Sequence, residues 1–462
     1  MSNSTNTRND KASMLSTVAY SIGSSGANVS FYMINNFLMV FYTDIVGLTA
    51  SAISIIMLLA RIWDAANDPM MGIIEDRTHT RLGKFRPWLI VGPPFLAVFN
   101  VLTFTVFPLE GTMKAVVCGI CYIGAGMFYT VVQVAVNGLV NRLTNDSQQK
   151  MNIISIAQIA NQLGQIAVAA VLMPIILHFS GNEVANGRGY FFGTLIISLV
   201  TLPMIWFAAW KCREVSVDEP QAAGGEKKKA SLGTSIKGIL KNDQLCISIL
   251  TTFLSCVAII GRYALLSYYL IYVAKSYMLI SVVFSLMSFS QMLGNIPLPF
   301  LTKKFGKKTV FIWMNICSAT AMVALFFAPV TTLVVIVLSF IIGFLGAAGS
   351  ITYSFICDCV EYGNWKLGIR DDGLAFSMMS FGVKLSSAIT GAIGAPLLVA
   401  VGYVANQDQS AYTTTAINAI VNIAPAVIIL ISLLPLIKYK LDNKTMDKIS
   451  ADLAERNSAS AN

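Results

Sequence analysis

The chain has 462 residues, of which 55% are hydrophobic and only 12% are charged. This composition excludes an ordinary soluble domain and indicates a polytopic membrane protein. The net charge of +9 arises largely from basic residues in loops between apolar segments, where they indicate topology and contact with anionic lipid headgroups. We therefore expect membrane lipids, and no nucleic acid, as partners.

Twelve apolar stretches are each near the roughly 20 residues that a membrane-spanning helix needs. They lie at 15 to 43, 49 to 74, 88 to 107, 114 to 140, 152 to 178, 189 to 210, 245 to 274, 277 to 302, 309 to 328, 331 to 356, 372 to 402 and 413 to 437. None has the roughly ten-residue alternation of a transmembrane barrel strand. The sequence predicts an all-α membrane protein with twelve transmembrane helices in two six-helix bundles.

A polar, Gly- and Lys-containing connection separates two sets of six stretches. We predict an N-terminal six-helix bundle at 1–210, a cytoplasmic central linker at 211–244, a C-terminal six-helix bundle at 245–437 and a cytoplasmic tail at 438–462. Most of the 32 Lys and Arg residues then lie on one side of the membrane. The positive-inside rule therefore predicts a multi-pass protein of the cell membrane with both termini in the cytoplasm.

The second stretch places two carboxylates inside an apolar segment. Asp64, Asn67 and Asp68 fall in one sector of a helix, and Arg61 lies one turn earlier. Each acid at mid-membrane would cost roughly 2.5 to 3.5 kcal/mol, so this sector must face protein or a wet cavity. We interpret the cluster as a cation site. The alternative is an Arg61–Asp64 pair that only holds helices together, which leaves Asp68 unexplained.

Short basic loops follow the second and eighth stretches, at 81–86 and 304–308, and their similarity supports two related halves. A further charged segment follows the tenth stretch. We expect charge pairs across the inner rim to fasten the closed state, each exposed and therefore worth roughly 0 to 1 kcal/mol. The predicted gating residues are Arg81, Lys84, Arg86, Asp358, Glu361 and Arg370.

The chain shows no nucleophile elbow, phosphate-binding loop or catalytic triad pattern, and its Cys and His residues have no convincing metal-ligand spacing. We therefore expect no enzyme activity, no metal centre and no cofactor. Six plus six stretches around a central linker are the layout of secondary transporters whose halves move around a midplane site. A channel would need rings of polar groups, whereas the intramembrane acids are confined to the first half.

The segment 61–72, followed by 81–88, strongly resembles the glycoside-pentoside-hexuronide cation symporters, the family of the melibiose permease. Further matches run along nearly the whole chain, at 41–44, 129–130, 358–363, Lys366, Arg370, Lys384 and 402–406. The resemblance implies a major facilitator fold and cation-coupled uptake of a glycoside, pentoside or hexuronide by alternating access. We expect the chain to function as a monomer.

The resemblance implies a sodium, lithium or proton site made of Asp64, Asn67, Asp68 and Thr130. The residue chemistry agrees, because a hard monovalent cation prefers several oxygen ligands. Since a proton carrier would not need the amide and the hydroxyl, we predict sodium coupling, with proton coupling as the alternative. Lys384 resembles the family's membrane-embedded lysine, which would neutralise the acids when the cation is absent. A purely structural counter-charge is the other interpretation of Lys384.

The substrate side departs from the melibiose permease, which binds its galactoside through charged groups. The corresponding positions here are uncharged, and the candidate substrate ligands among them are Asn28, Gln133, Asn137 and Gln158. Amides still donate to and accept from hydroxyls, so a sugar or glycoside remains the predicted substrate, although amides also join helices. Arg262 adds an intramembrane guanidinium, which favours an acidic substrate or else pairs structurally.

Two other functions remain open from the sequence. Distant relatives of this fold carry amphipathic, lipid-like solutes, and a non-transporting sensor could derive from a carrier. A sensor is expected to carry an output domain, and the short tail after Lys438 does not suggest one.

Overall fold

The computed structural model describes residues 13–78, 80–144, 147–181, 184–212, 214, 242–367 and 372–461. Their regular secondary structure is helical apart from one isolated bridge between Thr80 and Gly83. Ten helical segments in this part of the chain are long and apolar enough to cross a membrane. The described residues fall into two compact units, unit 1 within Met1–Pro220 with Ile280–Ser285, and unit 2 within Gln221–Leu279 with Leu286–Asn462.

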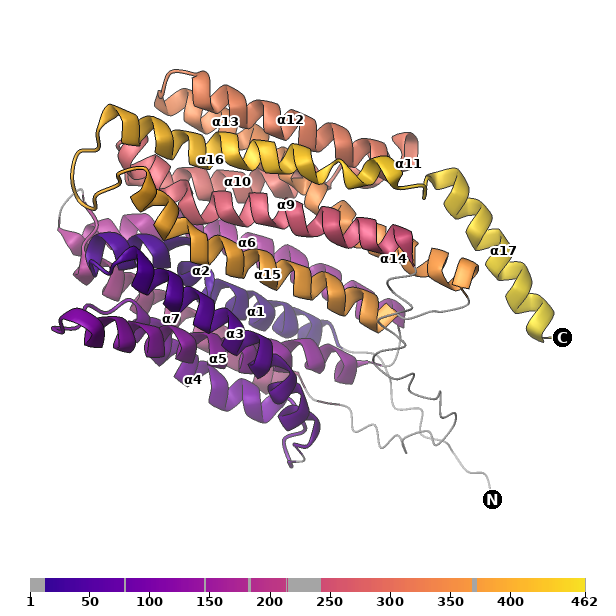
Figure 1. Cartoon of the computed structure of the whole chain (residues 1–462). Coiled ribbons are helices and arrows are strands. Elements are labelled where there is room, and N and C mark those ends of the chain that lie inside the picture. The colour runs from indigo at the N-terminus through magenta and orange to yellow at the C-terminus, as the bar shows by residue number, and fades with distance from the viewer. Residues whose placement is uncertain are drawn as a thin grey trace. The chain divides into compact units, whose positions relative to one another are not determined.

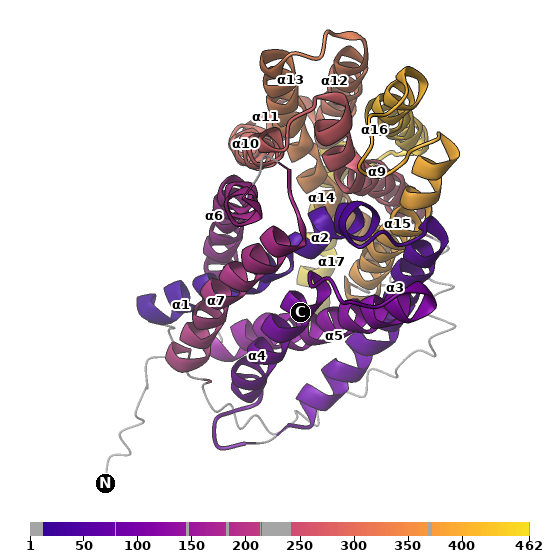
Figure 2. The same ribbon diagram turned by 90° about the vertical axis from the view of Figure 1, so that its left-hand side faces the viewer.

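Unit 1 contains the indigo to magenta helices of Figure 1. They are α1 (Met14–Ser30), α2 (Tyr32–Val40), the π-helical turn η1 (Phe41–Ile45), α3 (Ala50–Asp76), α4 (Arg86–Thr103), α5 (Gly111–Leu143), α6 (Ser147–Ser180) and α7 (Gly187–Lys211). Helix α5 packs against α3 and α4, while α1 packs against α6 and α7 (Figure 2). Leu89, Val136 and Ile205 bring α4, α5 and α7 into one buried core.

Unit 2 contains the later helices, drawn in pink to yellow, apart from Ile280–Ser285 of α10. They are α9 (Asp243–Tyr268), the π-helical turn η2 (Tyr269–Val273), α10 (Met278–Asn295), α11 (Leu298–Phe305), α12 (Lys307–Phe327), α13 (Thr332–Leu345), η3 (Gly346–Ala348), α14 (Gly349–Leu367), α15 (Asp372–Ala400), α16 (Ala411–Ser432), η4 (Pro435–Lys438) and α17 (Asn443–Ala461). Helix α9 packs against α15 and α16. The tail helix α17 belongs to the same core, because Ile449 is 1% exposed and Trp365 Nε1 donates to Asp452 Oδ2 at 2.9 Å.

The predicted spans correspond closely to these helices. The two that are not among the ten candidate spans are 15 to 43, where a break at Phe31 separates a helix of 17 residues from one of 9, and 88 to 107, which is α4 with 18 residues. The predicted stretch at 331 to 356 is interrupted by η3 between α13 and α14. Helix α7 ends at Lys211 and α9 begins at Asp243, close to the predicted linker boundaries.

The first helical segment of each unit ends in the same way. In unit 1, Val46 N donates to Phe41 O at 2.9 Å, and Gly47 follows with φ of 72°. In unit 2, Ala274 N donates to Tyr269 O at 2.9 Å, and Lys275 follows with φ of 54°. A single π turn followed by one left-handed residue therefore recurs in both halves, although the residues that form it differ.

Candidate functional site

Helix α3 buries the polar sector that carries the two acids. Asn67 is 4% exposed and lies on the same face as the buried Ala60 and Met71, while Ile55 and Ile62 on the opposite face are 58% and 59% exposed. The apolar face therefore suits lipid, and the polar residues point into unit 1. This is the facing that the helical period predicts.

Helix α5 supplies the partners of this sector. Thr130 Oγ1 donates to Asp68 Oδ1 at 3.0 Å, and Asn67 Nδ2 lies 3.5 Å from the carbonyl oxygen of Met127. A Cβ added to Gly126 would lie 3.1 Å from Asp64 Oδ1, so the missing side chain keeps α5 close to this acid. The four residues predicted for the cation site thus lie along one α3–α5 contact.

The two acids have different surroundings. Arg61 Nη1 lies 3.3 Å from Asp64 Oδ2, and their side chains are 22% and 19% exposed. Asp68 instead accepts from the Thr130 hydroxyl. The Arg61–Asp64 pair therefore exists, but it does not account for Asp68. The cluster offers carboxylate, amide and hydroxyl oxygens from two helices, which is the donor set that a small hard cation prefers.

Lys384 lies on α15 in unit 2 and its side chain is exposed in the structure, whereas the acids lie on α3 in unit 1. Its part as their counter-charge therefore stays a prediction. Among the described residues, no group of three or more His, Cys, Asp or Glu side chains is placed to hold a metal ion.

The four predicted substrate amides lie on three helices of unit 1. Gln133 Nε2 is 3.4 Å from Asn137 Oδ1, one turn along α5. Asn28 on α1 donates to the Ser24 carbonyl at 2.9 Å within its own helix, and Gln158 on α6 is exposed. Within the described segments, hydrogen bonds join two of the four directly, and Asn28 and Gln158 are not linked to them.

Arg262 lies on α9 in unit 2 and is 2% exposed. Its Nη1 is 3.7 Å from the Met287 sulfur on α10, whereas its Nε and Nη2 donate to no atom in the described part of the chain. The structural pairing with an acid or a helix end that the sequence left open is thus not found among these residues. Arg262 keeps two donors for another partner.

The loop at 80–85 of unit 1 is held by a residue that the sequence did not single out. Both carboxylate oxygens of Glu214, just after α7, accept backbone N–H groups at the start of α4: Lys84 N at 2.8 Å, Phe85 N at 2.8 Å and Arg86 N at 3.0 Å. Arg86 Nε also donates to the Ala209 carbonyl at 2.7 Å. No local pattern marks Glu214, because its partners are about 130 residues earlier in the chain.

Asp358, a predicted gating residue of unit 2, has a partner in its own unit. Asp358 receives two contacts from Lys307 Nζ, at 2.7 and 2.8 Å, and Lys307 was not among the predicted gating residues. Glu361 is exposed, and Arg81 of unit 1 is exposed as well. Arg370 lies outside the described residues. A charge pair across the rim would have to compete with Lys307 for Asp358.

Replacing Lys307 by Gln should lower the stability of the protein. The Asp358 side chain is 8% exposed and would lose both contacts, whereas Lys307 is 30% exposed. We therefore expect the free energy of unfolding to fall by about 1 to 2 kcal/mol, less than the roughly 3 to 5 kcal/mol for breaking a fully buried pair. Thermal unfolding of the purified protein measures this effect. The double variant Lys307→Gln, Asp358→Asn should be less destabilised than the sum of the single variants. Additive losses would show that the pair is not coupled.

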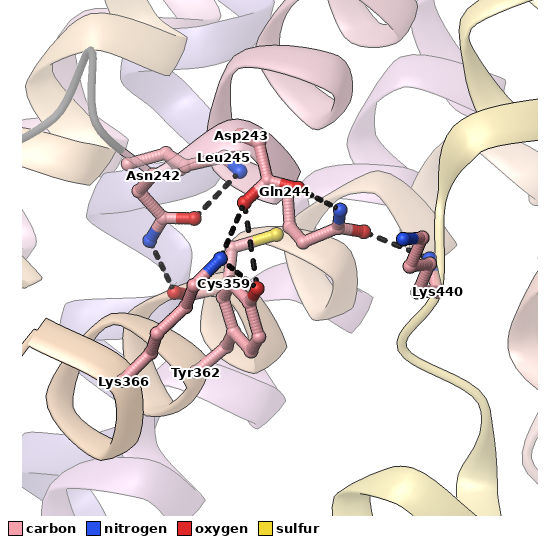
Figure 3. Close-up of polar contacts among 8 residues, drawn as sticks. All are labelled: Asn242, Asp243, Gln244, Leu245, Cys359, Tyr362, Lys366 and Lys440. Atoms are coloured by element: carbon pink, nitrogen blue, oxygen red, sulfur yellow. Dashed lines mark hydrogen bonds and ion pairs between the residues drawn. The ribbon is translucent and has the colours of Figure 1, made fainter.

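The start of α9 contacts α14 and the segment around Lys440 (Figure 3). The Asn242 side chain accepts from Leu245 N at 3.1 Å and donates to the Cys359 carbonyl at 2.8 Å, which ties α9 to α14. Lys366 Nζ donates to Tyr362 OH at 2.7 Å and lies 3.4 Å from Asp243 Oδ1. The loop after α16 joins them through Lys440 N, which donates to Gln244 Oε1 at 2.8 Å.

Comparison with protein families gives one match over most of the chain. Residues 19–443 fit the family model described as MFS/sugar transport protein. The isoprimeverose transporter of Lactiplantibacillus pentosus is 31% identical over 442 residues, which cover 95% of this chain and 91% of that protein. A glucuronide carrier protein homolog of Escherichia coli is 28% identical and covers 97% of each chain.

Solved structures show the same fold at low sequence identity. The xylose transporter of Escherichia coli in an inward-open conformation has a TM-score of 0.61 at 15% identity, covering 94% of this chain and 98% of that one. A bacterial homolog of the human lysosomal transporter Spinster has a TM-score of 0.65 at 11% identity, covering 94% and 97%. The predicted all-α membrane fold of the major facilitator type is confirmed.

Proposed function

Because the chain belongs to the MFS/sugar transport protein family, and within it to the glycoside-pentoside-hexuronide symporters, we propose that it couples the movement of a sugar or glycoside to that of a monovalent cation. The two units act as the moving halves of an alternating-access carrier in the cell membrane, with both termini in the cytoplasm. The chain works as a monomer.

The α3–α5 contact is the observation that carries the proposal of cation coupling. Two carboxylates and an amide of α3 meet a hydroxyl of α5 there, and Thr130 already donates to Asp68 at 3.0 Å. Holding two acids within the membrane is costly unless a cation or a proton compensates them. The cluster therefore supports binding of sodium at Asp64, Asn67, Asp68 and Thr130, with lithium or protons as the other ions of this site.

The amides of unit 1 support a polyhydroxylated substrate. Gln133 and Asn137 form an adjacent pair on α5, and Asn28 and Gln158 add donors and acceptors on α1 and α6. The names of the relatives, an isoprimeverose transporter and a glucuronide carrier homolog, agree with this class. The inner gate would use Arg81, Lys84 and Arg86 of unit 1 with Asp358, Glu361 and Arg370 of unit 2, and Lys384 would balance the acids when the cation leaves.

We expect uptake of the transported glycoside into membrane vesicles to depend on a sodium gradient. The amide and hydroxyl oxygens beside the two acids suit a metal cation and would not be needed for a proton. The measurement is a screen of radiolabelled mono- and disaccharides and glycosides, each with an imposed sodium gradient, an imposed pH gradient or neither. Uptake that does not depend on sodium and is abolished by a protonophore would assign protons, and not sodium, as the coupling ion. Failure of every sugar, with uptake of a lipid-like solute instead, would overturn the sugar proposal.

A further inference from the structure

Arg262 keeps a two-donor edge without a partner. Nε and Nη2, the two nitrogens of Arg262 without a hydrogen bond among the described residues, lie on the same side of the guanidinium. Their N–H bonds point nearly parallel and form the fork that matches the two oxygens of a carboxylate. The third nitrogen, Nη1, faces the Met287 sulfur at 3.7 Å, and a thioether is a weak acceptor.

Among the described residues, no carboxylate lies within hydrogen-bond distance of this edge. The sequence contains no Asp or Glu at 244–357, 373–407 or 409–441, which include α10, α12, α13, α16 and all of α9 beyond Asp243. Asp243 lies 19 residues before Arg262, about 28 Å along the helix axis at 1.5 Å per residue. Asp358 is held by Lys307. Arginine cannot become neutral, so a guanidinium that is 2% exposed requires an acceptor from elsewhere.

A second buried donor lies on the helical segment that carries Arg262. Tyr269 follows it by seven residues, two helical turns along the same face, and is 0% exposed. The Tyr269 hydroxyl also has no hydrogen-bond partner among the described residues. The Arg262 fork and the Tyr269 hydroxyl are thus three buried donors on one face of this segment, and donors of this kind suit an oxyanion.

We propose that Arg262, assisted by Tyr269, binds an oxyanion carried by the transported molecule, so that the preferred substrate is an acidic sugar or glycoside with a carboxylate or sulfonate group. This inference rests on the proposed function of the chain as a sugar symporter. The group on the substrate supplies the acceptor that Arg262 lacks among the described residues. The protein then prefers an acidic over a neutral substrate because only the acidic one pairs with the buried guanidinium, which a neutral substrate leaves unpaired.

The test compares a matched pair of ligands, a methyl glucuronide and the corresponding methyl glucoside, in competition for uptake by the full-length protein in vesicles. The wild type should prefer the glucuronide. Arg262→Gln should weaken the glucuronide tenfold to a hundredfold and leave the glucoside nearly unchanged. Arg262→Lys keeps the charge but loses the fork, so it should recover only part of the preference. Tyr269→Phe should weaken the glucuronide severalfold.

Three results would overturn the inference. The first is an equal loss of affinity for both ligands in Arg262→Gln, and the second is a wild type that does not prefer the glucuronide. The third is inhibition of uptake by free acetate or sulfate that depends on Arg262 while the wild type shows no preference for the glucuronide, which would assign the site to a free anion. Arg188→Gln, which removes an exposed guanidinium, is the matched control and should change neither ligand. Thermal unfolding of each variant separates loss of binding from loss of folding. Cation-driven glucoside uptake without glucuronide preference would leave the proposed function intact, whereas failure of both ligands and of the wider sugar screen would remove it.

Discussion

Replacing Asp68 by Asn is expected to abolish uphill accumulation of substrate while exchange of substrate across the membrane is less affected. The substitution keeps the size of the side chain and removes the charge that accepts from Thr130 at 3.0 Å. Without this carboxylate charge the site loses its affinity for the cation, so the cation gradient no longer drives transport. Accumulation in energised vesicles and exchange in de-energised vesicles measure the two activities separately.

Two controls make the result specific. Asp408 lies in a loop and its side chain is fully exposed, so Asp408→Asn should leave accumulation unchanged. At the site itself, Thr130→Ser keeps the hydroxyl and should retain coupling, whereas Thr130→Val should weaken the cation dependence. Normal accumulation by Asp68→Asn would show that the α3–α5 cluster is structural and that the coupling ion binds elsewhere.

Replacing Gly343 by Ala is expected to lower the thermal stability of the protein clearly. A Cβ at Gly343 would lie 2.7 Å from both the Cα and the carbonyl oxygen of Met287, so α13 and α10 touch through their backbones. Backbone atoms cannot rotate away as a side chain can, and overpacking of this kind costs about 1 to 3 kcal/mol or more. Small residues at such crossings are what allow membrane helices to pack closely. Thermal unfolding in detergent measures the loss.

Gly346 provides the control three residues away. A Cβ at Gly346 meets no atom within 4 Å, so Gly346→Ala should be nearly neutral. A second close approach lies across the same contact, because a Cβ at Gly294 on α10 would collide with the Phe344 carbonyl oxygen. Equal melting temperatures for Gly343→Ala and Gly346→Ala would show that the α10–α13 crossing relaxes at little cost.

The sequence predicted the helices well because their signal is local. An apolar run of sufficient length must satisfy its backbone hydrogen bonds internally within lipid, which leaves a helix as the solution for each stretch. The sector of Asp64, Asn67 and Asp68 on α3 followed from the helical period and the cost of exposing acids to lipid. The break at Phe31 and the two π turns were not visible, since they depend on how neighbouring side chains pack.

The partners of the charged residues were much harder to predict. The basic loops were recognised, but the gating hypothesis gave Asp358 a partner from the first half, whereas Lys307, 51 residues away within the second, holds it in the structure. Glu214 binds the backbone amides of Lys84 and Phe85 just before α4, and the sequence did not single it out. A backbone N–H carries no residue-specific signal, so no inspection of side chains along the chain could have identified this contact.

By itself, the sequence determined the membrane class, the helical stretches and the residue types available for binding, because burial in lipid acts on each segment separately. The tertiary structure alone decided which oxygen atoms converge and which charges are already paired. Thr130 meets Asp68 across 62 residues, and two donors of Arg262 have no partner among the described residues. These outcomes depend on the rotation and crossing of packed helices, which a few ångströms of side-chain contact determine and which no local pattern encodes.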